Sequence, residues 1–156
     1  MTKIQKHVEA LKHKRRDTRR KAAYTLGKIR DQEAVSYLAD TLRDVDWEVR
    51  SAAAWALGEI GSQAATPDLV NALRDDSGGV RVGVAQALRK IGDRAAVPRL
   101  IEALDDGNEV VVAEVTNTLA SLGEKSAVPA IRKLLESSDP LVHMTAARAL
   151  RKFEGE

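Results

Sequence analysis

The stretch from Asp46 to Gly61, DWEVRSAAAWALGEIG, decides the fold because it recurs, with changes, in four further copies. Each copy lies 31 residues from the next, and no insertion breaks this register in a chain of 156 residues. Three apolar positions keep the spacing: Val49, Val80, Val111 and Val142; Leu26, Leu57, Leu88, Leu119 and Leu150; Ile29, Ile60, Ile91, Leu122 and Phe153. Such a fixed period is typical of solenoids, in which each repeat buries its apolar face on its neighbours.

Each copy predicts two helices. In the longer helix, Val49, Ala53 and Leu57 recur at the spacing of one helical face, between an N-cap at Asp46 and a C′ glycine at Gly61. The shorter helix has candidate caps at Asp31, Ser62 and Asp93. The predicted helices are 2–12, 16–29, 33–43, 47–60, 64–74, 78–91, 95–105, 109–122, 126–136 and 140–153. The sequence therefore predicts an all-α solenoid of five 31-residue helical hairpins.

The repeats fill one predicted domain, 1–156, divided at about 1–31, 32–62, 63–93, 94–124 and 125–156. The absence of cysteine excludes disulfides, thiolate metal sites and cysteine nucleophiles. The first sixteen residues lack the apolar segment of a secretory signal, and no apolar run is long enough for a membrane span, so we expect a cytoplasmic protein. No catalytic constellation, metal site or cofactor site is predicted, because the three histidines lack partners at ligand spacing.

The pattern V-R-x-x-A-A-x-A-L-G-x-I-G, which repeat two carries from Val49 to Gly61, resembles the HEAT-like repeats first recognised in phycobilisome bilin lyases. The A-V-P-x-L-x-x-A-L segment from Ala96 to Leu104 extends the resemblance to the shorter helix. It implies a right-handed superhelix with the V-R-x-x-A-A helices on the concave side. It also implies a bilin lyase-like subunit as an alternative to a binding scaffold. The repeats depart from the pattern at Val112 and His143, which replace its arginine.

The side of the longer helix opposite Val49 differs from copy to copy, and this divergence predicts a protein-binding surface. In repeat two this side carries Ala52 and Trp55, and Trp47 borders it. In repeat three a shallow depression is predicted, because three nearby residues have no side chain: Gly78, Gly79 and Gly83. The predicted partner-binding residues are Arg20, Tyr24, Lys28, Trp47, Glu48, Ser51, Trp55, Glu59, Gly79, Val82 and Gln86. Because no core residue is predicted on this side, Trp55→Gln is expected to change the free energy of unfolding by only about 0.5 kcal/mol. The alternative is that the rings only complete the packing between helices.

Arginine also recurs at the repeat period, at Arg19, Arg50 and Arg81. Asp44 and Asp75 precede the second and third of these by six residues, which predicts a ladder of Asp–Arg contacts between repeats. Phosphate binding by these arginines is the alternative.

Charge is divided unevenly along the chain. Residues 1–30 hold eleven Lys or Arg and two Asp or Glu, a net charge of +9, whereas residues 31–156 hold fourteen and twenty-one, a net charge of −7. The basic cluster consists of Lys12, Lys14, Arg15, Arg16, Arg19, Arg20 and Lys21. It is predicted to be a solvated end of the solenoid, with an acidic protein partner or nucleic acid as the alternatives.

Overall fold

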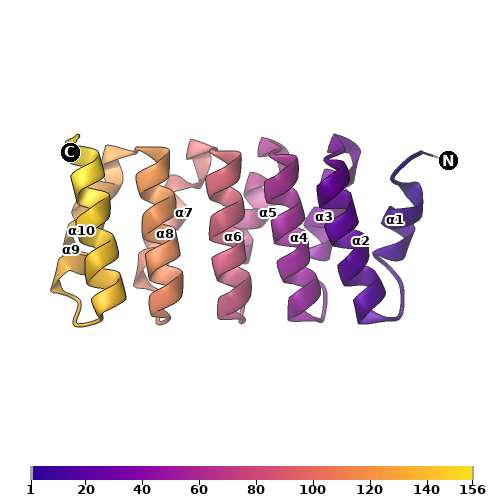
Figure 1. Cartoon of the computed structure of the whole chain (residues 1–156), viewed down its shortest axis with the longest axis horizontal. Coiled ribbons are helices and arrows are strands. Elements are labelled where there is room, and N and C mark those ends of the chain that lie inside the picture. The colour runs from indigo at the N-terminus through magenta and orange to yellow at the C-terminus, as the bar shows by residue number, and fades with distance from the viewer. Residues whose placement is uncertain (1, 156) are drawn as a thin grey trace.

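The computed structural model describes residues 2–155, in which short and long helices alternate along the chain (Figure 1). The short, odd-numbered helices are α1 (Gln5–Ala10), α3 (Val35–Thr41), α5 (Thr66–Ala72), α7 (Val97–Glu102) and α9 (Val128–Lys133). The long, even-numbered helices are α2 (Arg16–Ile29), α4 (Trp47–Ile60), α6 (Gly78–Ile91), α8 (Glu109–Leu122) and α10 (Pro140–Glu154). The predicted all-α solenoid of five hairpins is confirmed, and the bounds of the even helices agree with the prediction except that α10 ends one residue later.

The odd helices are shorter than the repeat pattern predicted. A 3₁₀ turn precedes each of α3, α5, α7 and α9, at Gln32–Ala34, Gln63–Ala65, Arg94–Ala96 and Lys125–Ala127. Two more 3₁₀ turns follow α7 and α9, at Ala103–Asp105 and Leu134–Glu136. The helix expected at 2–12 is α-helical only over Gln5–Ala10, where Ile4 supplies no capping side chain. The tighter 3₁₀ geometry is common at helix ends because it satisfies backbone groups that lack an α-helical partner.

Side-chain caps begin most even helices. The Asp46 carboxylate accepts the amides of Glu48 and Val49 at 2.9 and 3.4 Å. Ser77, Asn108 and Asp139 cap α6, α8 and α10 in the same way. Asp31 and Asp93 cap the 3₁₀ turns that follow them, but the prediction for Ser62 was wrong, because its side chain accepts no bond there.

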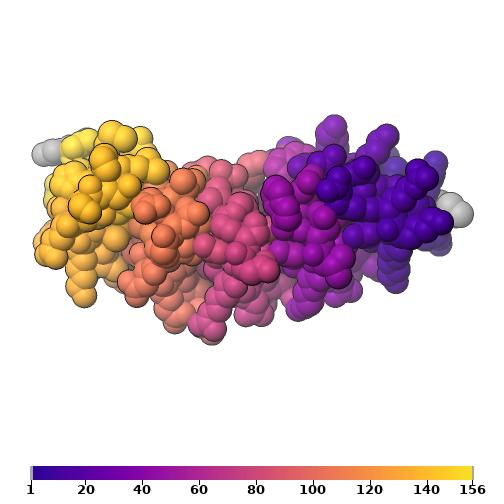
Figure 2. Space-filling model, turned by 90° about the horizontal axis from the view of Figure 1, so that it is seen from below, coloured from indigo at the N-terminus to yellow at the C-terminus, as the bar shows by residue number. Residues whose placement is uncertain are grey.

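The even helices form one layer and the odd helices form the other (Figure 1). Each even helix contacts the next directly, whereas α3 and α5 contact the 3₁₀ turn that precedes the next odd helix. The core leucines that repeat every 31 residues lie between the layers and are fully buried through four copies: Leu26, Leu57, Leu88 and Leu119. The result is a gently bent row of similar units (Figure 2). No helix within residues 2–155 is long and apolar enough to cross a membrane.

Two glycines allow the even helices to approach closely. A Cβ atom built on Gly27 would lie 2.7 Å from the Cα of Ala56, and one built on Gly58 would lie 2.9 Å from the Cα of Ala87. Both distances are shorter than real Cβ contacts, so these two positions require glycine while the helices keep their spacing. Close spacing in the even layer bends the row toward that layer, and this agrees with the implied position of the even helices on the concave side.

Candidate partner-binding surface

The predicted binding residues belong to the open face, which we define as the side of α2, α4, α6, α8 and α10 that points away from the odd helices. In Figure 1 the even helices lie in front of the odd ones, so this face is turned toward the viewer. The open face is narrower than the helical-wheel angles predicted. Ala52 was placed on it but is fully buried, because the neighbouring helices cover both flanks of α4.

Trp55 and Tyr24 form an aromatic pair on neighbouring helices of this face. Their ring centroids are 5.2 Å apart and their planes are inclined by 59°, an arrangement favoured by aromatic quadrupoles. Trp55 is half-buried against the core, and its ring edge would be 2.7 Å from a Cβ built on Gly27. We expected that no residue on this side contacts the core, and this expectation was wrong for Trp55. Tyr24 is 39% exposed.

A small hollow lies beside this aromatic pair, and we call it the Trp55 hollow. Its volume is about 140 Å³. It is lined by Tyr24, Ser51, Trp55, Gly83, Gln86, Ala87 and Lys90. Four of the predicted binding residues therefore line one depression. Gly83, whose missing side chain was expected to leave a depression, lines it as well.

A second, wider hollow lies at the N-terminal ends of α4 and α6, and we call it the Trp47 hollow. Its volume is about 530 Å³. It is lined by Val45, Asp46, Trp47, Arg50, Asp76, Ser77 and Gly79. Trp47 is 52% exposed, and a Cβ built on Gly79 would stand 3.8 Å from its ring. Trp47, unlike Trp55, thus presents much of its apolar ring to solvent above a glycine.

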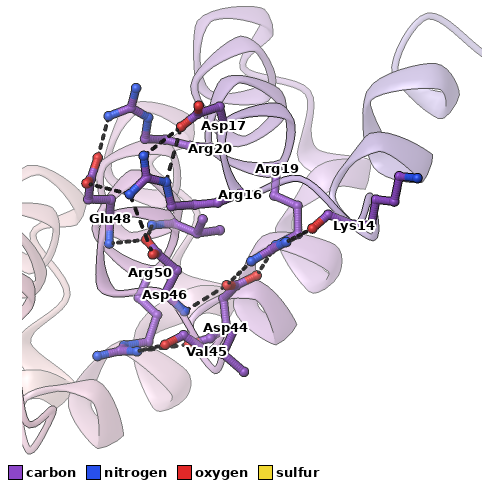
Figure 3. A network of polar contacts seen from close by, with 11 residues as sticks. Lys14, Arg16, Asp17, Arg19, Arg20, Asp44, Val45, Asp46, Glu48 and Arg50 are labelled. Carbon is purple, nitrogen blue, oxygen red and sulfur yellow. Dashed lines mark hydrogen bonds and ion pairs between the residues drawn. The ribbon is translucent and has the colours of Figure 1, made fainter.

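Three of the four charged members of the predicted set, Arg20, Glu48 and Glu59, are paired across the even layer. Arg20 on α2 contacts Glu48 on α4 at 2.5 Å, and Arg16 reaches the same carboxylate at 3.3 Å (Figure 3). Glu59 on α4 is held between Lys90 and, at 2.6 Å, Arg30. The bond from Lys90, followed by that from Arg30, lowers the pKa of Glu59. These residues join neighbouring helices as well as facing solvent.

The remaining two predicted residues lie outside both hollows. Lys28 is exposed near the C-terminal end of α2, and Val82 is half-buried against the core. Neither is among the residues that line the Trp47 or Trp55 hollow.

The predicted Arg–Asp ladder is confirmed over three rungs. Each arginine forms a two-pronged contact with an aspartate of the next repeat, 25 residues later: Arg19 with Asp44 at 2.7 and 2.9 Å, Arg50 with Asp75 at 2.8 and 3.0 Å, and Arg81 with Asp106 at 2.7 and 2.9 Å. The aspartate six residues before an arginine binds it through its backbone carbonyl instead, as Asp44 does for Arg50 at 2.9 Å (Figure 3). The ladder thus connects the first four repeats, one to the next.

The contacts of the first two rungs shift the pKa values of Asp44, Asp75 and Arg50. Burial raises the pKa of the Asp44 carboxyl, but the bonds from Arg19 and from the Asp46 amide outweigh it, and the net pKa is lowered. Asp75 shows the same balance, with Arg50 and the Ser77 amide as its donors. The bond to Asp75 in turn raises the pKa of Arg50. The carboxylates of Asp44 and Asp75 therefore stabilise the folded chain in their charged form.

The ladder ends where the sequence departs from the pattern. Val112 occupies the fourth arginine position and is buried. His143 occupies the fifth, and its Nδ1 lies 2.8 Å from the carbonyl oxygen of Leu135 in the same repeat. This contact holds His143 against the backbone of its own repeat.

The basic cluster is divided between paired and exposed residues. Its arginines Arg16, Arg19 and Arg20 form ion pairs with carboxylates of α2, α4 and the loop before α4. Within residues 2–155 the other four members, Lys12, Lys14, Arg15 and Lys21, are exposed and have no ion-pair partner. Only part of the predicted basic surface is therefore available to an anionic partner.

The sequence-based selection omitted an apolar patch farther along the open face. Val110 on α8 is 54% exposed, and Leu141 and Met144 on α10 are 39% and 58% exposed. These residues occupy the repeat positions of Glu48 and Ser51, so internal comparison indicated that they vary. Apolar residues at positions that face solvent are the signal in the sequence that could have identified this patch as part of the surface.

Comparisons with known proteins agree with this architecture. The HEAT-repeat family profile matches residues 4–89, 38–117 and 97–156. No curated protein sequence matches the chain. Among solved structures, a chain in the complex of CpcE and CpcF of phycocyanin lyase from Nostoc sp. PCC7120 is 29% identical, with a TM-score of 0.85. The match covers all of the present chain and 66% of that chain, slightly less than two thirds.

Two further structures show how widely the fold is shared. An engineered protein is 26% identical over 98% of the present chain and 80% of its own, with a TM-score of 0.71. Human deoxyhypusine hydroxylase in complex with glycerol is 18% identical, with 98% and 85% coverage and a TM-score of 0.56, and therefore shares the fold alone. The repeat pattern, the helical hairpins and the family match lead to one conclusion: the chain belongs to the HEAT-repeat family, with repeats of the phycobilisome lyase type.

Proposed function

We propose that this chain is a protein-binding scaffold whose partner lies across the open face of α4 and α6. The proposal is supported by the two hollows, which gather Tyr24, Trp47, Trp55 and Gln86 on neighbouring helices. Exposed aromatic side chains beside depressions are typical of the residues that contribute most to protein–protein affinity. The apolar patch at Val110, Leu141 and Met144 extends the same surface toward the C-terminus.

The observation that carries the proposal is the presence of Gly79 and Gly83 within α6. A Cβ atom at either position would meet its nearest neighbour at 3.6 Å, an ordinary van der Waals distance, so packing does not require glycine. Glycine inside a helix costs about 0.5–1 kcal/mol relative to alanine. The chain therefore accepts a less stable helix where glycine keeps the hollows open, which is the pattern expected of a surface shaped for a partner.

Affinity capture with matched variants tests the proposal. Wild-type protein, Trp47→Ala and Tyr37→Ala serve as baits in lysate of the source cells, and quantitative mass spectrometry compares the retained proteins. Tyr37 is a suitable control because it is a 44% exposed aromatic residue on the odd helix α3. We expect a partner that wild type and Tyr37→Ala retain and Trp47→Ala loses. Equal retention by all three baits would remove the open face from the interface.

A bilin lyase-like subunit is the second candidate, and the similarity to the phycocyanin lyase complex favours it. Mixing the purified chain with a free bilin and recording the visible absorption spectrum tests this candidate. A shifted and intensified bilin band supports tetrapyrrole binding, whereas an unchanged spectrum supports the scaffold alone.

A further inference from the structure

The Trp47 hollow combines an apolar wall with carboxylates at its rim. Trp47 and Val45, which is 92% exposed, supply the apolar surface, and Gly79 leaves the space between them and α6 free of a side chain. Asp46 and Asp76 line the same hollow. An exposed indole ring next to negative charge suits the side chain of lysine or arginine, which can lay its methylene stem on the ring and place its cation beside a carboxylate.

Arg50, the one cation that lines this hollow, has no free donor. Its Nε and Nη2 donate to Asp75 at 2.8 and 3.0 Å, and Nη2 also donates to Asp76 at 2.7 Å. Its Nη1 donates to the carbonyl oxygens of Asp44 and Val45 at 2.9 and 3.3 Å. These five contacts match the five N–H groups of a guanidinium. A carboxylate or phosphate group would therefore have to break the ladder to bind Arg50.

The rim of the hollow keeps an excess of negative charge. Asp75 already matches the charge of Arg50, so Asp76, whose side chain is 91% exposed, is additional. Asp46 uses one oxygen as the cap of α4, and its other oxygen has only a distant cation, Arg16, at 4.0 Å. Figure 3 shows Asp46 between Arg16 and the backbone of α4. Both aspartates retain acceptor capacity toward the hollow.

We propose that the Trp47 hollow binds a lysine or arginine side chain from an extended segment of the partner protein. This inference rests on the proposed function and adds the chemistry of the partner. The cationic side chain lies on the indole of Trp47 and donates to Asp46 and Asp76, whose charge is complementary to its own. A partner segment that is acidic at this point is disfavoured, because Arg50 is saturated and the rim is negative.

The apolar patch gives the segment a second feature. Val110 is in the first turn of α8, as Trp47 is in the first turn of α4, and two helix spacings separate them. Packed helices lie about 8–10 Å apart, so the two positions are about 16–20 Å apart along the row. An extended chain advances about 3.3 Å per residue, which places an apolar residue about five or six positions from the cationic one.

Selection from a phage-displayed library of random twelve-residue peptides tests the inference. Wild-type protein, the Asp46→Asn/Asp76→Asn double variant and the Asp105→Asn variant are used as targets. Asparagine is an equally good N-cap, so the double variant keeps the cap of α4. Asp105 is an exposed carboxylate at the end of the 3₁₀ turn Ala103–Asp105, one repeat away, and it provides a control for a generic loss of charge. Circular dichroism melts establish that all three targets are folded.

Wild type and Asp105→Asn are expected to enrich peptides with lysine or arginine five or six positions from an apolar residue, and the double variant is expected to lose the basic preference. A fluorescein-labelled synthetic copy of an enriched peptide should bind the double variant about tenfold more weakly, and the control within about twofold, by anisotropy. Enriched peptides without a basic residue, or equal affinities for all targets, overturn the inference and leave the scaffold proposal intact. No enriched peptide together with no captured partner contradicts both.

Discussion

Four of the five glycines in the even helices fall into two pairs with opposite surroundings. Gly27 and Gly58 face the next helix, where an added Cβ would come within 2.9 Å of backbone Cα atoms. Gly79 and Gly83 face solvent, where an added Cβ would have ordinary contacts at 3.6 Å or more. Packing between helices explains the first pair. It does not explain the second pair, whose members line the two hollows. The same residue type therefore distinguishes the packed side of these helices from their open face.

This difference separates stability from recognition. Changes on the packed side should affect folding, and their cost should depend on how many repeats cover the position. Changes on the open face should affect a partner more than the fold. The following predictions test this separation, beginning with the largest expected effect.

Leu88→Ala should lower the free energy of unfolding by about 2–5 kcal/mol, the usual range for truncation of a buried leucine. Leu88 is fully buried in the middle repeat, whereas Leu150 is 8% exposed and, within residues 2–155, is covered by a neighbouring repeat on one side only. Leu150→Ala should therefore cost less. Urea unfolding followed by circular dichroism measures both, and equal losses would contradict the description of stability as a sum of nearest-neighbour contacts.

Gly27→Ala should lower the free energy of unfolding by about 1–3 kcal/mol, because the new methyl group meets the backbone of Ala56 at 2.7 Å. The greater helix propensity of alanine offsets only part of this cost. The same urea experiment measures it. A neutral or stabilising result would show that the helices separate readily and that close approach does not fix the spacing of the even layer.

Acid should weaken the packed side through the ladder. The pKa values of Asp44 and Asp75 are lowered in the folded chain, so the folded state holds fewer protons than the unfolded state near these values. Their contribution is present in full above the unfolded pKa of about 4 and is lost as pH falls through the lowered values. Urea midpoints between pH 6 and pH 2 measure this dependence. The Asp44→Asn/Asp75→Asn variant should show a shallower decline, and an identical decline would exclude these carboxylates as its cause.

The two tryptophans should differ in their effect on stability. Trp55→Gln should cost about 1–2 kcal/mol, because its half-buried ring packs on Tyr24 and the α2 backbone at Gly27. Trp47→Gln should change stability by about 0.5 kcal/mol or less, as at other exposed sites. Urea melts give both values, and acrylamide should quench Trp47 more strongly than Trp55 in single-tryptophan variants. A larger loss of stability for Trp47→Gln than for Trp55→Gln would contradict the difference in burial between the two rings.

The sequence predicted most of the fold because the repeats provide five versions of each position. Helix α4 was located at both ends by its apolar spacing, the cap at Asp46 and the glycine at Gly61, which has a φ of 74°. Arg30 at the corresponding position has a φ of 58°, so the backbone keeps its form even without glycine. The shortness of α1 was not predicted, because the repeat pattern does not show that its cap is missing.

The candidate site was less predictable, because it depends on neighbours that a helical wheel does not represent. The helical wheel placed Ala52 and Trp55 on the same side of α4. In the structure α2 and α6 cover the flanks of α4, so Ala52 is fully buried and Trp55 is partly buried. The ladder was recognised from its period, but the sequence places an aspartate both six residues before and 25 residues after Arg50 and Arg81. Only the spacing between repeats shows that Arg50 forms its two-pronged contact with Asp75.

The most direct test of the separation between packing and recognition is Gly83→Ala. The new methyl group has its nearest neighbour, the Ser51 hydroxyl, at 3.6 Å and reduces the Trp55 hollow. We expect the free energy of unfolding to rise by about 0.5–1 kcal/mol, because alanine replaces glycine within a helix. The affinity for the partner retained by wild-type protein should fall by about tenfold. Lower stability with unchanged affinity would show that Gly83 serves packing, and would contradict the assignment of the open face to partner binding.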